Sequence, residues 1–181
     1  MDNGESSYRR YLDGDEAAFA LVQEEYFDPL TFFIHRYVHD VSAAEDLAID
    51  SLVELIVHKH RYRFQQPLKT YLFSIGRHKA LDYIRRRNRI RMVSLEESGD
   101  PEDEKSLEAD LLASQRQRAV NTALKQLPEQ MQIAIHLVYF EELSYGDAGK
   151  VMGKSKKQVD NLLYRGKAML RSILGKESDL L

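Results

Sequence analysis

The sequence contains no cysteine, no tryptophan and only four prolines. The absence of cysteine excludes disulfides, thiolate metal sites and cysteine nucleophiles, and it suits a reducing compartment. No segment approaches the ~18 apolar residues that a membrane helix requires, and the N-terminus lacks the apolar core of a signal peptide. With 43% hydrophobic and 30% charged residues among 181, the composition predicts a cytoplasmic globular protein of one domain or two small ones, without membrane insertion.

Basic and acidic residues are unevenly distributed along the chain. Residues 59–91 hold eleven Lys and Arg and one Asp, whereas residues 91–115 hold eight Asp and Glu and two basic residues. Residues 150–176 are basic again, with eight Lys and Arg and one Asp. Such runs are often solvated helix faces. Two basic surfaces joined by a tether can, however, each neutralise phosphates, and binding of one raises the effective concentration of the other at the DNA. The pattern therefore favours DNA binding at two places.

Apolar residues recur at spacings of three and four nearly everywhere, without strand-like alternation, so the whole chain is predicted to be helical. A first helix is expected over residues 16 to about 39, capped by Asp13 or Asp15 and broken or kinked at Asp28-Pro29. The capping-box sequence Ser42-Ala43-Ala44-Glu45 predicts the start of a second helix.

A third helix is expected after a loop at residues 61–66. Pro67 suits its first position, and an apolar stripe follows and leads into the arginine run. These helices predict a first domain, residues 1–90. Residues 91–115, acidic and poor in large apolar residues, predict an extended linker. Residues 116–181 predict a second helical domain, in which Pro128 starts a helix that reaches Phe140.

The segment after Leu143 predicts a helix-turn-helix. Ser144 and Asp147 approximate a capping box, Gly153 permits the left-handed backbone that ends a helix, and Ser155 caps the next one. That last helix is apolar on one side only, and its other side carries groups that hydrogen-bond phosphates and base edges. The alternative is a helical hairpin with a polar outer face. Gly149 stands where most such motifs have Ala.

Three stretches, taken in order, resemble the extracytoplasmic-function sigma factors, the two-domain group of bacterial RNA polymerase sigma-70 subunits. They are Ala44-Glu45-Asp46-Leu47, TYLFSIGRHKALDYIRRRNR from Thr70 to Arg89, and LPEQMQIAIHLVYFEELSY from Leu127. The resemblance implies an all-α protein of two small domains joined by an acidic linker, the C-terminal one a helix-turn-helix domain of winged-helix-like or four-helix type. It implies no enzymatic activity and no cofactor.

The resemblance also implies roles for particular residues. Docking on core RNA polymerase would use Glu45, Asp46, Asp50 and Glu54. Recognition and melting of the minus-ten promoter element would use Arg61, Tyr62, Arg63, Phe64, Lys69, Tyr71, Arg77, His78, Lys79, Arg85 and Arg86. In the loop before Pro67, aromatic side chains would stack on a flipped base, although Tyr62 and Phe64 could equally belong to the core.

The C-terminal helix-turn-helix would read the minus-thirty-five element of duplex promoter DNA. Its candidate contacts are Lys156, Lys157, Gln158, Asn161, Tyr164 and Arg165. Tyr71 replaces a common Trp of the family, and His78 stands where Asn is frequent. The family further implies an anti-sigma factor as a partner, and an acidic linker that occupies a polymerase channel built for nucleic acid.

Three other interpretations remain open at this stage. His35 and His39 have the spacing of a metal pair, but Arg36 lies between them and no Glu accompanies them as in zinc proteases, so an enzyme is disfavoured. A helical module could bind an acidic protein through the basic runs. An independent helix-turn-helix regulator would bind DNA without core polymerase, but no dimerisation segment is visible.

Overall fold

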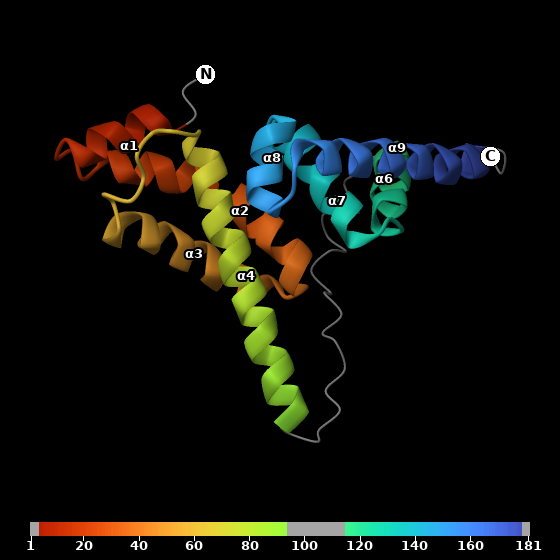
Figure 1. Ribbon diagram of the computed structural model, residues 1–181, viewed down its shortest axis with the longest axis horizontal. Coiled ribbons are helices and arrows are strands. Elements are labelled where there is room, and N and C mark those ends of the chain that lie inside the picture. Colours follow the sequence, from red (N-terminus) through yellow and green to blue (C-terminus); the bar gives the residue numbers. More distant parts are fainter. Residues whose placement is uncertain (1–3, 94–114, 179–181) are drawn as a thin grey trace. The chain divides into compact units, whose positions relative to one another are not determined.

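The computed structural model describes residues 4–93 and 115–178. The chain divides into two compact units, residues 1–101 and 102–181. The described residues form helices and contain no strand, which confirms the predicted all-α fold (Figure 1). The expected linker falls almost wholly on residues 94–114, outside the described residues. Within the described ranges, no helix is both long and apolar enough to cross a membrane.

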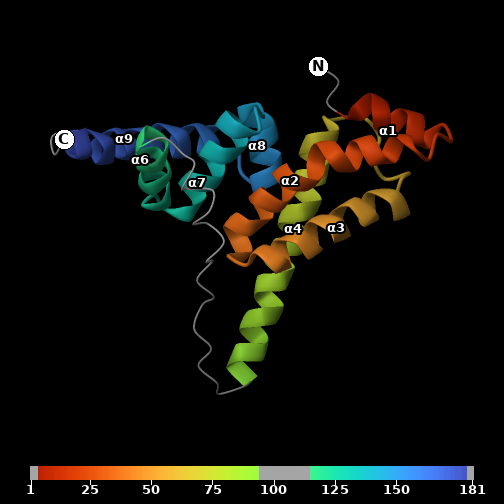
Figure 2. The ribbon, with the colours of Figure 1, turned by 180° about the vertical axis from the view of Figure 1, so that it is seen from behind.

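The first unit consists of α1 (Glu5–Leu12), α2 (Ala18–Val38), α3 (Val41–Val57) and α4 (Leu68–Val93). Helices α2, α3 and α4 pack against one another, and α1 packs on α2; Figure 2 shows this arrangement from behind. Gly76 marks the close approach of α4 to α2, because a Cβ there would lie 2.8 Å from Leu30 Cδ1. The core includes Val22, Tyr26, Leu30, Phe33, Leu52, Leu55, Leu68, Leu72 and Phe73.

The N-terminal part of this unit differs from the expectation. Helix α1 was not predicted, and α2 begins after Ala17 without a side-chain cap. Asp15 does not cap α2, because its carboxylate binds the Arg10 guanidinium, with Nε at 3.1 Å. Helix α2 also continues through Pro29. Buried residues on both sides of the proline, Tyr26 and Leu30, hold this stretch against the core, so tertiary packing outweighs the lost backbone hydrogen bond.

The start of α3 lies before the predicted capping box. Asp40 has an extended backbone, and its side chain accepts a hydrogen bond of 3.0 Å from the N–H of Ala43. Asp40 therefore provides the cap expected from Ser42, two residues earlier in the chain. Helix α4 starts after Pro67, whose carbonyl accepts a 3.2 Å bond from the N–H of Tyr71.

The second unit consists of α6 (Gln115–Lys125), α7 (Glu129–Ile135), the π-helix η1 (His136–Phe140), α8 (Tyr145–Met152) and α9 (Lys156–Ser178). Helix α9 packs on α6, α7 and α8. The helix expected to reach Phe140 changes to π geometry at His136, whose carbonyl accepts a 3.0 Å bond from the N–H of Glu141. The wider turn leaves the side chain of Phe140 more than half exposed, while His136 stays buried.

Candidate nucleic-acid interface

The turn between α8 and α9 has the geometry that the helix-turn-helix pattern predicts. Ser144 Oγ accepts a 3.1 Å hydrogen bond from the N–H of Asp147 and donates one of 2.6 Å to its carboxylate. Gly153 ends α8 in the left-handed conformation, with φ of 65°. The described residues thus confirm the predicted cap and the predicted glycine turn.

Helix α9 is capped by a reciprocal pair. The N–H of Gln158 donates to Ser155 Oγ at 3.2 Å, and the N–H of Ser155 donates to Gln158 Oε1 at 2.8 Å. This is a full capping box, in which Gln158 is the N3 residue. The amide oxygen of Gln158 is therefore engaged by the protein, and its NH₂ group is the part left to face a ligand.

The two sides of α9 differ as the sequence predicts. Val159, Leu163 and Gly166 are buried on the side that packs on the rest of the unit. The opposite side is exposed at every candidate position, namely Lys156, Lys157, Gln158, Asn161, Tyr164 and Arg165. Tyr164 is 75% exposed, which is unusual for a large aromatic residue. The N-terminal part of α9 thus presents cations, amides and an aromatic ring together.

The loop before α4 separates the four residues that the sequence grouped together. Arg61 and Arg63 are exposed, Phe64 is half-buried, and Tyr62 is buried at 5% exposure. The hydroxyl of Tyr62 donates to the carbonyl of Gln66 at 2.7 Å, and burial raises its pKa, so it remains protonated. This placement favours the core alternative for Tyr62 and leaves Phe64 as the aromatic ring accessible within the loop.

Helix α1 supports this loop, a relationship that the sequence reasoning missed. Tyr8 is fully buried; its hydroxyl donates to the carbonyl of Leu55 at 3.0 Å, and its ring contacts those of Tyr62 and Phe64. The Arg9 guanidinium carbon lies 3.8 Å from the centre of the Phe64 ring. The only sequence signal was the pair of arginines beside a tyrosine in the first ten residues.

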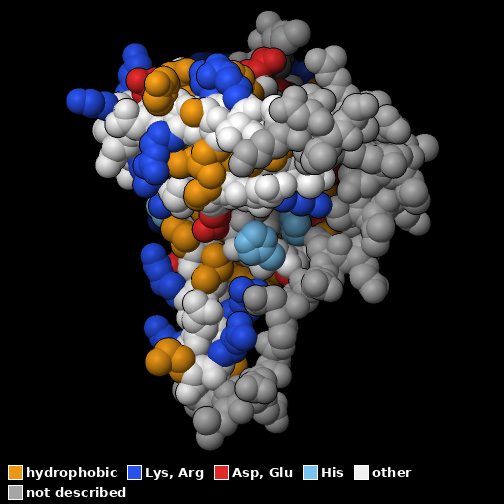
Figure 3. Space-filling view, turned by 90° about the vertical axis from the view of Figure 1, so that its right-hand side faces the viewer, with side chains coloured by type: hydrophobic (Ala, Val, Ile, Leu, Met, Phe, Trp, Pro, Cys, Tyr) orange, Lys and Arg blue, Asp and Glu red, His pale blue; other side chains and the backbone are white. Residues whose placement is uncertain are grey.

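The candidate DNA contacts on α4 fall into two groups. His78, Arg85 and Arg86 are exposed, whereas Lys69, Tyr71, Arg77 and Lys79 are half-buried. Lys79 Nζ lies 2.9 Å from Glu54 Oε2 of α3, so this lysine is directed towards a neighbouring helix. Figure 3 shows Lys and Arg side chains along the C-terminal part of α4, in the lower part of the view.

The candidate docking residues lie on one helix, α3, beside exposed apolar residues. Glu45, Asp46 and Asp50 are exposed, while Glu54 is half-buried in its pair with Lys79. Four large apolar side chains on the same helix are also exposed, namely Ile49, Val53, Ile56 and Val57. Their spacing of three and four places them on one face, so α3 presents a mixed acidic and apolar surface.

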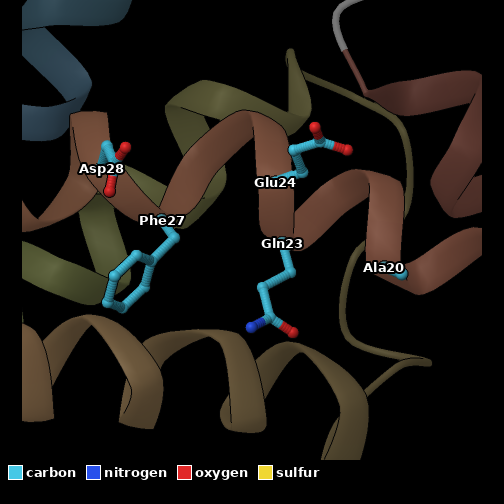
Figure 4. A pocket seen from close by; sticks show the side chains of 5 residues that line it. All are labelled: Ala20, Gln23, Glu24, Phe27 and Asp28. Atoms are coloured by element: carbon cyan, nitrogen blue, oxygen red, sulfur yellow. The ribbon is translucent and has the colours of Figure 1, made fainter.

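The histidine pair noted in the sequence does not belong to a larger metal-binding group among the described side chains. The rings of His35 and His39 are 6.4 Å apart, and no group of three or more metal-binding side chains surrounds them or occurs elsewhere in the described ranges. A hollow of about 390 Å³ is lined by five residues of α2, with Gln23 and Phe27 pointing towards α3 (Figure 4). None of its five lining residues is a candidate nucleic-acid contact. Its charged residues, Glu24 and Asp28, are acidic and exposed.

Comparisons with known proteins agree with this arrangement. The Sigma-70 region 2 family matches residues 22–90, and the Sigma-70 region 4 family matches residues 117–170. The RNA polymerase sigma-H factor of Pseudomonas aeruginosa is 27% identical over 91% of this chain and 90% of its own length. The ECF RNA polymerase sigma factor SigX of Bacillus subtilis is 28% identical over 86% of this chain and 83% of its own length.

Solved structures share the fold. The sigma factor RpoE of Bartonella quintana, in complex with the anti-sigma factor NepR, aligns with a TM-score of 0.67 and 22% identity, covering 87% of this chain and 96% of that one. CnrH, in complex with the cytosolic domain of CnrY, aligns with the same TM-score and 19% identity, covering 97% of this chain and 99% of that one. The two family matches together span more than half of the sequence, and the chain belongs to the sigma-70 family of RNA polymerase sigma factors, in the extracytoplasmic-function group.

Proposed function

We propose that this sigma factor docks on core RNA polymerase through α3, reads the minus-thirty-five element with α9, and binds and opens the minus-ten element with α4 and the loop before it. It acts in the cytoplasm as a non-enzymatic subunit, and polymerase supplies the catalysis. The observation that carries this proposal is the division of α9 into a buried apolar side and an outer side with six exposed polar, basic or aromatic residues.

The minus-thirty-five contact rests on the cap of α9 as well as on its charge. The capping box fixes the first turn of the helix, and the N-terminal residues of a recognition helix are those that reach base edges. Lys156, Lys157 and Arg165 are suited to phosphates or guanine, and Asn161 to adenine. Gln158 contributes through its NH₂ group, because its oxygen caps the helix.

The minus-ten contact rests on exposed residues of α4 and the loop. Arg85, Arg86 and His78 are exposed on α4, and Arg61 and Arg63 are exposed in the loop that contains Phe64. An unpaired base can stack on an aromatic face, and arginines beside it can hold the phosphates. Lys79 supports α4 through Glu54 instead of meeting DNA.

The docking proposal extends from the acidic residues to the apolar ones. Glu45, Asp46 and Asp50 attract a basic partner, and Ile49, Val53 and Val57 bury apolar area once it is bound. The described part of α3 offers this combination on a single face. Because charges at a rim mainly affect association rate and apolar anchors mainly affect dissociation, the two sets have separable effects.

We also propose that an anti-sigma protein holds this chain inactive. Support comes from the solved structures above, in which the sigma factor RpoE is in complex with the anti-sigma factor NepR, and CnrH is in complex with the cytosolic domain of CnrY. The partner would cover the DNA-facing or docking surfaces until a signal releases the chain. Recovery of no inhibitory partner in pull-downs from the native host would remove this part of the proposal.

Run-off transcription with core polymerase and a promoter library tests the main proposal. Paired alanine substitutions at Arg85 and Arg86, or at Lys157 and Arg165, are expected to abolish or redirect start-site selection. Arg10→Ala is the matched control, because Arg10 is exposed and pairs with Asp15. Tight, sequence-specific binding of the purified chain to duplex DNA without polymerase would instead favour an independent regulator.

A further inference from the structure

The ring of Phe64 is held in place from several sides. Tyr62 lies 4.6 Å from it between ring centres, and the ring of Tyr8 lies 6.4 Å away. Phe64 also has a φ of 57°, in the left-handed region that a bulky residue rarely adopts. Such a conformation persists only where its surroundings impose it, and it is concentrated at functional sites. The ring is therefore fixed before any ligand arrives.

The Arg9 guanidinium lies over this ring, with its carbon 3.8 Å from the ring centre. One of its nitrogens, Nη2, binds Glu5 Oε1 at 3.0 Å within the same helix, and the arginine side chain is 55% exposed. The guanidinium thus contacts both the Phe64 ring and a carboxylate, while more than half of the arginine side chain remains exposed.

We propose that Arg9 is part of the single-strand site and that its outer guanidinium plane is the surface on which an unpaired base stacks, in the order Phe64, Arg9, base. This inference rests on the proposed role of the loop. Bases in single strands stack on aromatic rings and on arginine planes alike, and arginine combines such a plane with a charge that attracts the neighbouring phosphate. Helix α1 is thereby a part of the promoter-binding surface.

The plane and the charge of Arg9 can be separated by substitution. Arg9→Lys keeps the charge and loses the planar surface, and Arg9→Ala loses both. Arg10→Lys is the control, since Arg10 is adjacent and similarly exposed at 59%, and its guanidinium pairs with Asp15. The circular dichroism melting temperature of each variant verifies that the helices remain folded.

The experiment uses holoenzyme reconstituted from the full chain and core polymerase, with a forked promoter whose non-template minus-ten strand is single. The non-template strand is used in its complete form and in a series of forms that each lack one base. Affinity of the wild type is expected to fall about fivefold or more when the stacked base is removed. On the complete strand, Arg9→Lys is expected to bind more weakly than the wild type by a similar factor. Removing the stacked base should not weaken the binding of Arg9→Lys any further. Arg10→Lys is expected to bind both strands as the wild type does.

Two results would overturn the assignment of Arg9. One is wild-type affinity of Arg9→Lys for the complete strand, because only the charge would then matter. The other is that Arg9→Lys weakens the affinity by the same factor on the complete strand and on every abasic strand, because Arg9 would then contact no base. A failure of the proposed function is distinct: every abasic strand would bind the wild-type holoenzyme as tightly as the complete strand, whatever residue stands at position 9.

Discussion

The ammonium group of Lys79 on α4 lies 2.9 Å from a carboxylate oxygen of Glu54 on α3. The family resemblance implied different roles for these two residues, DNA contact for Lys79 and polymerase docking for Glu54, and their helices pack together. Both side chains are partly covered, at 25% and 33% exposure. Their pairing therefore joins the two proposed surfaces within the first unit.

Lys79→Ala is expected to leave the salt dependence of promoter binding unchanged, because a lysine paired with Glu54 releases no counterion from phosphate. Arg86→Ala, at an exposed position, is expected to make the plot of log affinity against log salt less steep, by about 0.7–0.9 in slope. Filter-binding or anisotropy titrations of the holoenzyme from low to moderate salt measure both slopes. Equal slopes for the two variants would contradict the distinction.

Gly149→Ala is expected to destabilise the second unit, although alanine is the commoner residue at this position of the motif. A Cβ at residue 149 would lie 2.6 Å from the carbonyl oxygen of Lys154, and relieving this clash requires a shift of the backbone. The overpacking costs about 1–3 kcal/mol, which outweighs the ~1 kcal/mol gain in helix propensity. Urea unfolding followed by circular dichroism measures the difference.

Gly146→Ala is the matched comparison in the same helix. A Cβ there would meet only Ser144 Oγ, at 3.7 Å, which is ordinary contact. This variant is expected to be more stable than the wild type by about 0.5–1 kcal/mol. If Gly149→Ala stabilised the protein as Gly146→Ala is expected to, the space around residue 149 would not be limiting.

Gln158→Glu is expected to separate the two roles of this residue. A glutamate at N3 still accepts the N–H of Ser155, so the free energy of unfolding should remain within about 0.5 kcal/mol of the wild type. Its negative charge should weaken binding to minus-thirty-five DNA several-fold. Gln158→Ala should lose stability as well as binding. Unchanged promoter affinity for Gln158→Glu would place residue 158 away from DNA.

The stabilising contribution of Asp147 is expected to depend on pH. Burial alone would raise the pKa of this carboxyl, but hydrogen bonds from Ser144 and Lys150, together with the charge of Lys150, outweigh burial and lower the pKa. A carboxylate whose folded pKa is below its unfolded value of about 3.9 stabilises the fold above that pH, and the effect is lost as the pH falls through the folded pKa.

Asp147→Asn should therefore unfold at lower urea than the wild type at neutral pH. The difference, less than about 1 kcal/mol because the Lys150 pair is solvent-accessible, should shrink between pH 5 and pH 3. Urea midpoints at several pH values provide the measurement. A difference that is constant with pH would mean that the asparagine acts through packing alone.

Local signals allowed much of the fold to be predicted from sequence. The cap at Ser144, the turn at Gly153 and the two-sided pattern of α9 each depend on residues within one or two turns, and the structure confirms them. The start of α3 was predicted two residues late, because Ser42 and Asp40 are both good caps and only the backbone geometry of Asp40 decides between them.

The remaining features depend on contacts between residues distant in sequence. Pro29 remains helical because buried neighbours hold α2 in place, and Tyr62 is buried because α1 covers the loop. Helix α1 itself has only eight residues, too short to be stable without the packing of Tyr8 on the core. No local pattern could have predicted the position of Arg9 over Phe64.

The π-helical turn at His136–Phe140 has a consequence for sequence changes of a single residue. A π turn holds one residue more than the α turn it replaces. Deleting one residue between Val138 and Phe140 would remove the extra residue and restore an ordinary α turn, with the downstream residues close to their present orientation. The connection leading to Ser144 would then keep its direction, so this short stretch should tolerate the loss of one residue better than the gain of one.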